Sequence, residues 1–232
     1  MTANGIVGST QDEIIQSITS FALYGFPESH AASFALIAYA SAYLKCHHLA
    51  AFTAAILNNQ PMGFYSPATL VKDAQRHGLK VRPIDVMQSK WECTLEDAGQ
   101  TLRIGLRYVR GLHETAGRAI VRARAEKTFT SIDDLVLRAP ELQKNELVQL
   151  AEIGALNFLD PVNQRHRRDA LWQVERAAQR TGPLLEKLET NSDPSPLERM
   201  TPEERLLADF GGTGMTIGPH PMSTTPVTPA RR

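Results

Sequence analysis

The chain has 232 residues, of which 42% are hydrophobic and 22% charged, values that are ordinary for a globular protein of one or two domains. Its 25 basic and 25 acidic residues cancel, which argues against a wholly basic nucleic-acid binder. The longest apolar run is too short to span a bilayer, the first residues do not resemble a signal peptide, and two cysteines are too few for a disulfide framework. We therefore expect a cytoplasmic protein that does not contact a membrane.

Three helices are expected in the first third of the chain. The first should run from Thr10 to Tyr24 and the second from Ser29 to about Leu57. The second helix is apolar on nearly all sides, which predicts a central, buried helix. A third helix should begin after Ser66, a good N-cap that is followed by Pro67, and end before Gly78.

Strands should follow the third helix. Leu79 to Val86 is expected to form a strand, with Pro83 at an edge or a bulge. Lys90 to Leu95 and Thr101 to Leu106 alternate in polarity and flank turn residues, Asp97 to Gln100. This pattern predicts a β-hairpin.

Helical periodicity returns in the second half. It predicts helices near Glu114–Arg124, Ser131–Leu137 and Lys144–Ile153, and a longer basic helix over Asn163–Arg180. From Pro183 onward, frequent proline, glycine, serine and threonine residues predict little packed structure. The fold class should therefore be mainly α with a small β-hairpin.

Charge is segregated along the chain. From Arg103 to Lys127, seven basic residues stand against only two acidic ones, Glu114 and Glu126. The following residues, 128–160, carry an excess of acidic side chains. Segregated charge directs an electrostatic field, so the basic stretch is a candidate surface for an anionic partner.

Residues 109–120, VRGLHETAGRAI, resemble a helix-hairpin-helix motif. In that motif, the backbone N–H groups of a short hairpin and the positive end of the second helix point at a phosphate. Gly111 occupies the place of the first glycine, and His113 stands where a second glycine is usual, although histidine tolerates a positive φ better than most residues. The candidate DNA contacts are Arg107, Arg110, Gly111, His113, Thr115, Arg118 and Arg122. A glycine turn between packed elements, with a solvated basic face, would give the same pattern.

A wider resemblance concerns residues 21–36, FALYGFPESHAASFAL, which resemble the end of the fingers domain in C-family bacterial DNA polymerases. Residues 58–65, NNQPMGFY, and 214–222, GMTIGPHPM, are closer to the error-prone, damage-inducible branch. The resemblance extends in colinear order over roughly residues 5–222. It implies a C-terminal end of the fingers (1–60), a helix-hairpin-helix DNA-binding domain (61–160), a basic helix (161–182) and a Pro/Gly-rich linker, partly disordered (183–232).

The resemblance also implies a function. The parent activity is DNA-directed nucleotidyl transfer in translesion synthesis, repair or replication, and this chain would grip the DNA backbone without sequence preference. The chain has no Asp-x-Asp pair of the kind that holds two metal ions in a polymerase palm, so we expect no catalytic residue, metal ligand or cofactor here and no activity of the chain alone. Mg²⁺ would belong only to the palm of the intact polymerase.

Further site and partner expectations follow. Ser29 and His30 would contact DNA or nucleotide in the intact polymerase, or simply form the start of a helix. The expected partners are duplex or primer-template DNA, the remainder of the polymerase and the sliding clamp, although Gln179 to Leu185 matches a clamp-binding peptide poorly. Two other interpretations stay open: a truncated or split-gene fragment with a structural role, and an accessory DNA-binding subunit that acts in trans.

Overall fold

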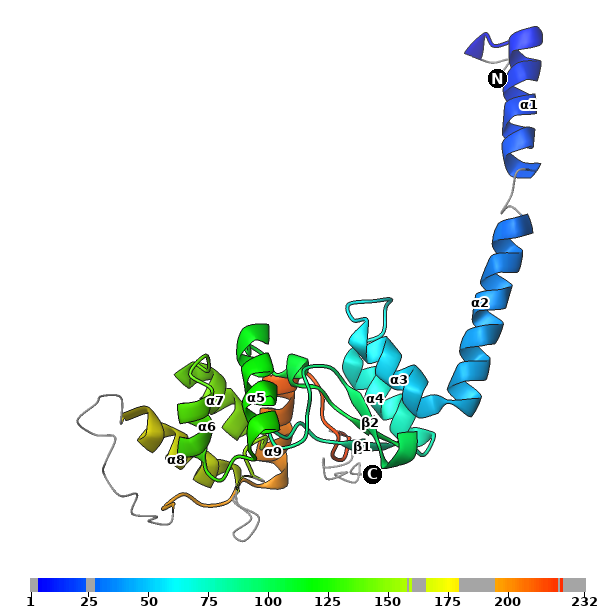
Figure 1. The fold of residues 1–232 in the computed structure, drawn as a ribbon. Coiled ribbons are helices and arrows are strands. Elements are labelled where there is room, and N and C mark those ends of the chain that lie inside the picture. Colours follow the sequence, from blue (N-terminus) through cyan, green and yellow to red (C-terminus); the bar gives the residue numbers. More distant parts are fainter. Residues whose placement is uncertain are drawn as a thin grey trace, which may run out of the picture. The chain divides into compact units, whose positions relative to one another are not determined.

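The computed structural model describes residues 4–23, 28–157, 159, 166–179, 195–220 and 222. The chain divides into two compact units, one ending at His48 and the other beginning at Leu49. Most of the described residues are helical, and the second unit holds one small sheet (Figure 1). The expected fold class, mainly α with a small β-hairpin, is confirmed.

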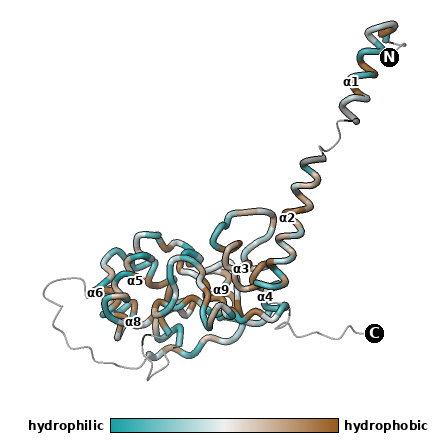
Figure 2. The backbone as a smooth tube through the Cα atoms, turned by 45° about the vertical axis from the view of Figure 1, so that its right-hand side comes forward, coloured by the Kyte–Doolittle hydropathy of each residue, from teal (hydrophilic) through white to brown (hydrophobic). Residues whose placement is uncertain are grey.

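The first unit contains two helices, α1 (Ser9–Leu23) and α2 (Glu28–His47). The single helix expected from Ser29 to Leu57 is therefore two, because α2 ends before His48 and α3 (Leu49–Asn58) begins after it. Helix α2 contains many hydrophobic residues, as the brown segments of its tube show (Figure 2). Its apolar side chains, among them Leu36 and Tyr39, are exposed. The prediction of a buried helix is wrong for α2, which the described residues of its unit do not cover, but it holds for α3, in which Ala50, Ala54 and Leu57 are buried.

The sheet of the second unit has three short strands, β1 (Lys80–Arg82), β2 (Thr94–Glu96) and β3 (Thr101–Arg103). The strand order is β1-β3-β2, with β2 antiparallel and β1 parallel to the central β3. The turn between β2 and β3, η2 (Asp97–Gly99), places three successive residues at positive φ. The predicted β-hairpin is confirmed in a shorter form, and β1 joins it as a third strand.

The second unit contains further helices. Those not yet given are α4 (Pro67–Arg76), η3 (Leu106–Tyr108), α5 (Glu114–Glu126), α6 (Ile132–Arg138), α7 (Lys144–Glu152), α8 (Arg167–Gln179) and α9 (Pro202–Thr213). The predicted start of α4 is confirmed, because the Ser66 hydroxyl accepts a hydrogen bond of 3.3 Å from the N–H of Thr69. None of the described helices combines the length and the apolar character needed to cross a membrane.

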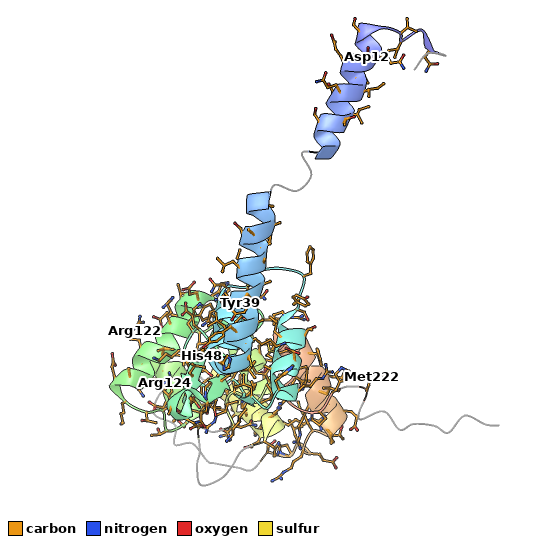
Figure 3. All side chains as sticks on the ribbon, turned by 90° about the vertical axis from the view of Figure 1, so that its right-hand side faces the viewer. Asp12, Tyr39, His48, Arg122, Arg124 and Met222 are labelled. Atoms are coloured by element: carbon orange, nitrogen blue, oxygen red, sulfur yellow. The ribbon has the colours of Figure 1, made fainter. Side chains whose placement is uncertain are left out.

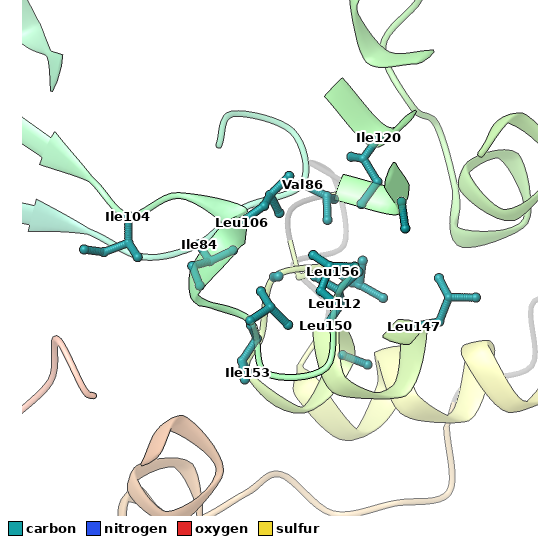
Figure 4. Close-up of a cluster of buried hydrophobic side chains, with 14 of the residues drawn as sticks. Ile84, Val86, Ile104, Leu106, Leu112, Ile120, Leu147, Leu150, Ile153 and Leu156 are labelled. Atoms are coloured by element: carbon teal, nitrogen blue, oxygen red, sulfur yellow. The ribbon is translucent and has the colours of Figure 1, made fainter. Parts of the chain in front are cut away.

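One continuous core joins the sheet to the helices. Leu106, Ile120, Leu150 and Leu156 are fully buried in it and come from η3, α5, α7 and the turn after α7 (Figure 4). Leu112, which lies between η3 and α5, is also buried there. The Leu112 side chain thus anchors the connection between η3 and α5 to the core.

Helix α9 lies in the region after Pro183 that was expected to be largely unpacked. A capping box starts this helix, with hydrogen bonds from Thr201 N–H to the Glu204 carboxylate (2.8 Å) and from Glu204 N–H to the Thr201 hydroxyl (3.2 Å). At its other end, Gly212 and Met215 are buried. The composition after Pro183, rich in proline, glycine, serine and threonine, predicted little packed structure, although Thr201 and Glu204 have the spacing of a capping box. The tail from 223 to 232 lies outside the described residues.

Candidate nucleic-acid interface

The short connection between η3 and α5, residues 109–113, is here called the connecting hairpin. Its exposed Gly111 has a φ of +77°, in the left-handed region that favours glycine. A Cβ at this position would meet no atom within 4 Å. Glycine is therefore favoured at this position by the backbone conformation and not by close packing. The open space around Gly111 leaves room for a ligand to approach.

The N-terminus of α5 has no side-chain cap. His113 is the N-cap residue, and the first bond of the helix runs from Gly117 N–H to the His113 carbonyl oxygen (3.0 Å). The N–H groups of Glu114 and Thr115 belong to the first turn, which has no acceptor within the helix. In the part of the chain that the structure describes, no acceptor from elsewhere is found for them either. This end of α5 thus presents donors and a positive dipole end to an anion.

His113 differs from the expectation in two ways. Its φ is −73°, so this position does not need the positive φ that a second glycine would supply. Its backbone N–H, which we expected to face a phosphate, donates to Glu146 Oε1 at 2.8 Å. The imidazole remains on the surface, with Nδ1 2.8 Å from the same carboxylate oxygen.

Glu146 is a site residue that the sequence did not reveal. Its side chain is 0% exposed, and its second oxygen accepts the N–H of Gln143, the N-cap of α7, at 2.7 Å. One buried carboxylate therefore holds the N-caps of α5 and α7 together. Burial acts to raise the pKa of Glu146, but the hydrogen bonds from Gln143 and His113 together outweigh it and lower the pKa below its ordinary value. The available signal was the spacing of Gln143 and Glu146, a capping box that also serves a second helix.

Two of the predicted arginines lie on the outer face of α5. Arg118 is 59% and Arg122 is 66% exposed, and each pairs at 2.7 Å with a surface carboxylate, Glu114 or Glu141. Figure 3 labels Arg122 on this helix. Exposed pairs of this kind contribute only about 0–1 kcal/mol. A phosphate group can therefore replace these carboxylates at little cost. Thr115 is exposed on the first turn of the same helix.

The other two predicted arginines are anchors within the protein. Arg107 donates to the carbonyl oxygens of Asn58 (2.6 Å) and Gln60 (3.2 Å), just where α3 ends. Arg110 donates through its guanidinium to the Gly211 carbonyl oxygen (3.1 Å) and through its backbone N–H to that of Gly212 (2.7 Å). Both arginines satisfy carbonyl groups at helix C-termini, which lack partners within the helix.

Two further members of the basic stretch are turned inward. Arg103 is buried and pairs with the Glu96 carboxylate, with Nε 2.5 Å from Oε1. Arg124 donates to the carbonyl oxygens of Val86 (2.5 Å) and Ser89 (3.0 Å). The positive surface is consequently narrower than the sequence suggested and follows the outer face of α5.

Ser29 and His30 lie in the first turn of α2, in the other unit. The His30 ring is exposed and meets the Phe34 ring edge to face, with 4.8 Å between centroids. The side chain of Ser29 lies outside the described part of the structure. This pair belongs to the first unit, and the connecting hairpin belongs to the second.

A separate apolar cavity of about 320 Å³ lies in the second unit. Its walls include Ile84, Ile104, Ile153, Leu206 and Met215, and none of the predicted DNA contacts. Among the described residues, no group of three or more histidine, cysteine or acidic side chains could hold a metal ion.

Comparisons with known proteins agree with these features. A family model described as a helix-hairpin-helix motif matches residues 78–170. The error-prone DNA polymerase of Anaeromyxobacter sp. (strain K) is 47% identical over 96% of this chain and 20% of its own length. The corresponding proteins of Alkalilimnicola ehrlichii and Pseudomonas savastanoi pv. phaseolicola are 43% and 46% identical, each over 96% of this chain and 22% of their own length.

The chain thus spans about a fifth of the length of the curated relatives it matches. The likeness covers nearly all of the chain, including the first unit, and so confirms the resemblance described for residues 5–222. The chain contains a helix-hairpin-helix motif and is homologous, over nearly its whole length, to part of the error-prone DNA polymerases.

Proposed function

We propose that this chain holds the backbone of DNA without sequence preference, as the DNA-binding portion of an error-prone DNA polymerase. The observation that carries the proposal is the uncapped N-terminus of α5, which stands beside the open, positive-φ Gly111. Backbone N–H groups at a helix N-terminus are ready donors to a phosphate oxygen. Phosphate contacts position a protein on DNA but carry no sequence information, so affinity should not depend on base sequence.

The exposed arginines of α5 extend this site. Arg118 and Arg122 follow Thr115 along the outer face of the helix, at spacings that keep them on one side. Each could exchange its surface carboxylate for a neighbouring phosphate of the same strand. Arg107 and Arg110 act indirectly, because Arg107 fixes the segment that leads into the connecting hairpin and Arg110 fixes the hairpin itself.

Translesion synthesis and repair, in the cytoplasm, would be the role of the whole polymerase. The role proposed for this chain is binding alone, because its sequence has no Asp-x-Asp pair of the kind that would hold the palm Mg²⁺. Metal-dependent primer extension by the purified chain would contradict this division of labour.

A salt titration of DNA binding tests the proposal. Each lost phosphate contact should lower the slope of log affinity against log salt by about 0.9, so the double variant Arg118→Ala/Arg122→Ala should lower it by about 2. Arg199→Ala removes an exposed arginine away from α5 and serves as the matched control, with an unchanged slope. Equal slopes for the wild type and the double variant would remove α5 from the DNA interface.

A further inference from the structure

The loop between α3 and α4, residues 59–66, carries exposed apolar side chains; we call it the aromatic loop. Phe64 is fully exposed, at 104%, and Tyr65 is 67% exposed. Met62 beside them is exposed as well, and Gly63 has a φ of +59°. The loop projects from the ends of α3 and α4 (Figure 1). Adjacent apolar side chains left in water contribute little to the stability of the fold, and their grouping in one loop indicates an interaction site.

The base of the aromatic loop is firmly held. The side chain of Asn58 pairs with the backbone of Cys93 in both directions, at 2.9 and 2.8 Å. Within the loop, Met62 N–H donates to the Gln60 side-chain oxygen at 3.1 Å. The rings are therefore presented from a fixed base, which lowers the entropy lost when a ligand binds them.

The same base is joined to the connecting hairpin. The guanidinium of Arg107 binds the carbonyl oxygens of Asn58 and Gln60, and the hydroxyl of Tyr108 donates to the Leu57 carbonyl oxygen at 2.8 Å. Arg107 and Tyr108 belong to η3, which leads directly into the hairpin. The aromatic loop and the proposed phosphate site thus share one support.

We propose that Phe64 and Tyr65 stack on unpaired nucleobases of the DNA whose backbone the connecting hairpin holds. We choose nucleobases as the ligand because the aromatic loop is joined to the proposed DNA interface and because it carries two exposed rings. The exposed rings of Phe64 and Tyr65 offer two faces for stacking, and the loop that carries them also contains the polar residues Asn59, Gln60 and Ser66. Every base has a π-face, so such stacking is sequence-tolerant and matches a backbone grip that does not read sequence. This inference rests on the proposed function.

Binding of the full 232-residue chain to two DNAs tests the inference. One is a blunt duplex, and the other is the same duplex with a single-stranded 5′ extension that carries 2-aminopurine. Phe64→Ala should weaken binding to the extended DNA about tenfold, or about 1.4 kcal/mol, and leave binding to the blunt duplex unchanged. Phe64→Trp should bind the extended DNA as tightly as the wild type does. The wild type should quench the fluorescence of 2-aminopurine, and Phe64→Ala should not.

The controls separate this inference from the proposed function. Leu207→Ala removes another exposed apolar side chain, on α9, and should alter neither affinity. Because Phe64 is fully exposed, Phe64→Ala should melt with the wild type in circular dichroism. If Phe64→Ala binds both DNAs as the wild type does, while Arg118→Ala/Arg122→Ala still reduces the salt slope, nucleobase stacking is refuted and the backbone grip stands. The loop would then belong to a protein contact. If the wild type binds neither DNA, both ideas fail.

Discussion

Replacement of Glu146 by alanine should loosen both helix N-termini that meet at its carboxylate. The change removes the acceptor for the N–H groups of His113 and Gln143, at 2.8 and 2.7 Å, and for the His113 ring. A hydrogen bond to a charged acceptor contributes about 1.5–3 kcal/mol, so the two backbone bonds together amount to about 3–6 kcal/mol. Both N-cap residues, His113 and Gln143, are exposed, so water can replace part of the lost hydrogen bonding. We therefore expect a loss of about 3 kcal/mol in the free energy of unfolding.

Urea denaturation followed by far-ultraviolet circular dichroism measures this loss. Glu141→Ala is the matched control, because that carboxylate also lies near the N-terminus of α7 but forms only a surface pair with Arg122. Its cost should stay below about 1 kcal/mol. Glu146→Gln keeps an oxygen acceptor without the charge and should fall between the two. If Glu146→Ala and Glu141→Ala unfold at the same urea concentration, the carboxylate does not join the two helices and the reasoning is refuted.

Three further outcomes are expected. The folded-state pKa of Glu146 lies below its unfolded value, so its stabilisation should be complete above the unfolded pKa, about 4.3, and should vanish as pH falls through the folded pKa. The urea midpoints of the wild type and Glu146→Gln should therefore converge on acidification, and a constant gap between them would contradict a stabilising role of the ionised Glu146 carboxylate. Gly111→Ala meets no atom but strains a φ of +77°, so it should cost about 1 kcal/mol of stability while weakening DNA binding. Gly117→Ala places a Cβ 2.5 Å from the Trp91 ring, so it should lower the melting temperature despite the better helix propensity of alanine, and an unchanged melt would show that the ring moves aside.

Local signals in the sequence predicted local structure well. Ser66 and Pro67 specify the start of α4, and polarity alternation around a turn specifies the β-hairpin. The parallel pairing of β1 with β3 has no local signal, because it depends on how α4 and the chain after β1 pack. The burial of α2 was predicted wrongly because an all-round apolar helix indicates neighbours, and the described residues of its unit do not supply them.

In the candidate site, too, the sequence indicates the features that depend on local conformation and not those that depend on tertiary packing. Gly111 could be recognised from the sequence because a positive φ in a short connection favours glycine over other residues. The arginines around it are alike in sequence, and only their partners distinguish them. Arg118 meets a glutamate four residues away, whereas Arg107 and Arg110 bind carbonyl groups 49 and 101 residues away. Such distant partners are set by tertiary packing, which no charge pattern records.

The hydrogen bonds between Arg110 and the end of α9 join two segments that are synthesised at different times. The connecting hairpin emerges from the ribosome about a hundred residues before the carbonyl groups of Gly211 and Gly212 that hold it. Chains fold as they are made, N-terminal parts first, so α5 forms while this anchor is still missing. The hairpin is therefore anchored late, only after α9 has been synthesised, and nascent chains that end before α9 carry the hairpin without this anchor.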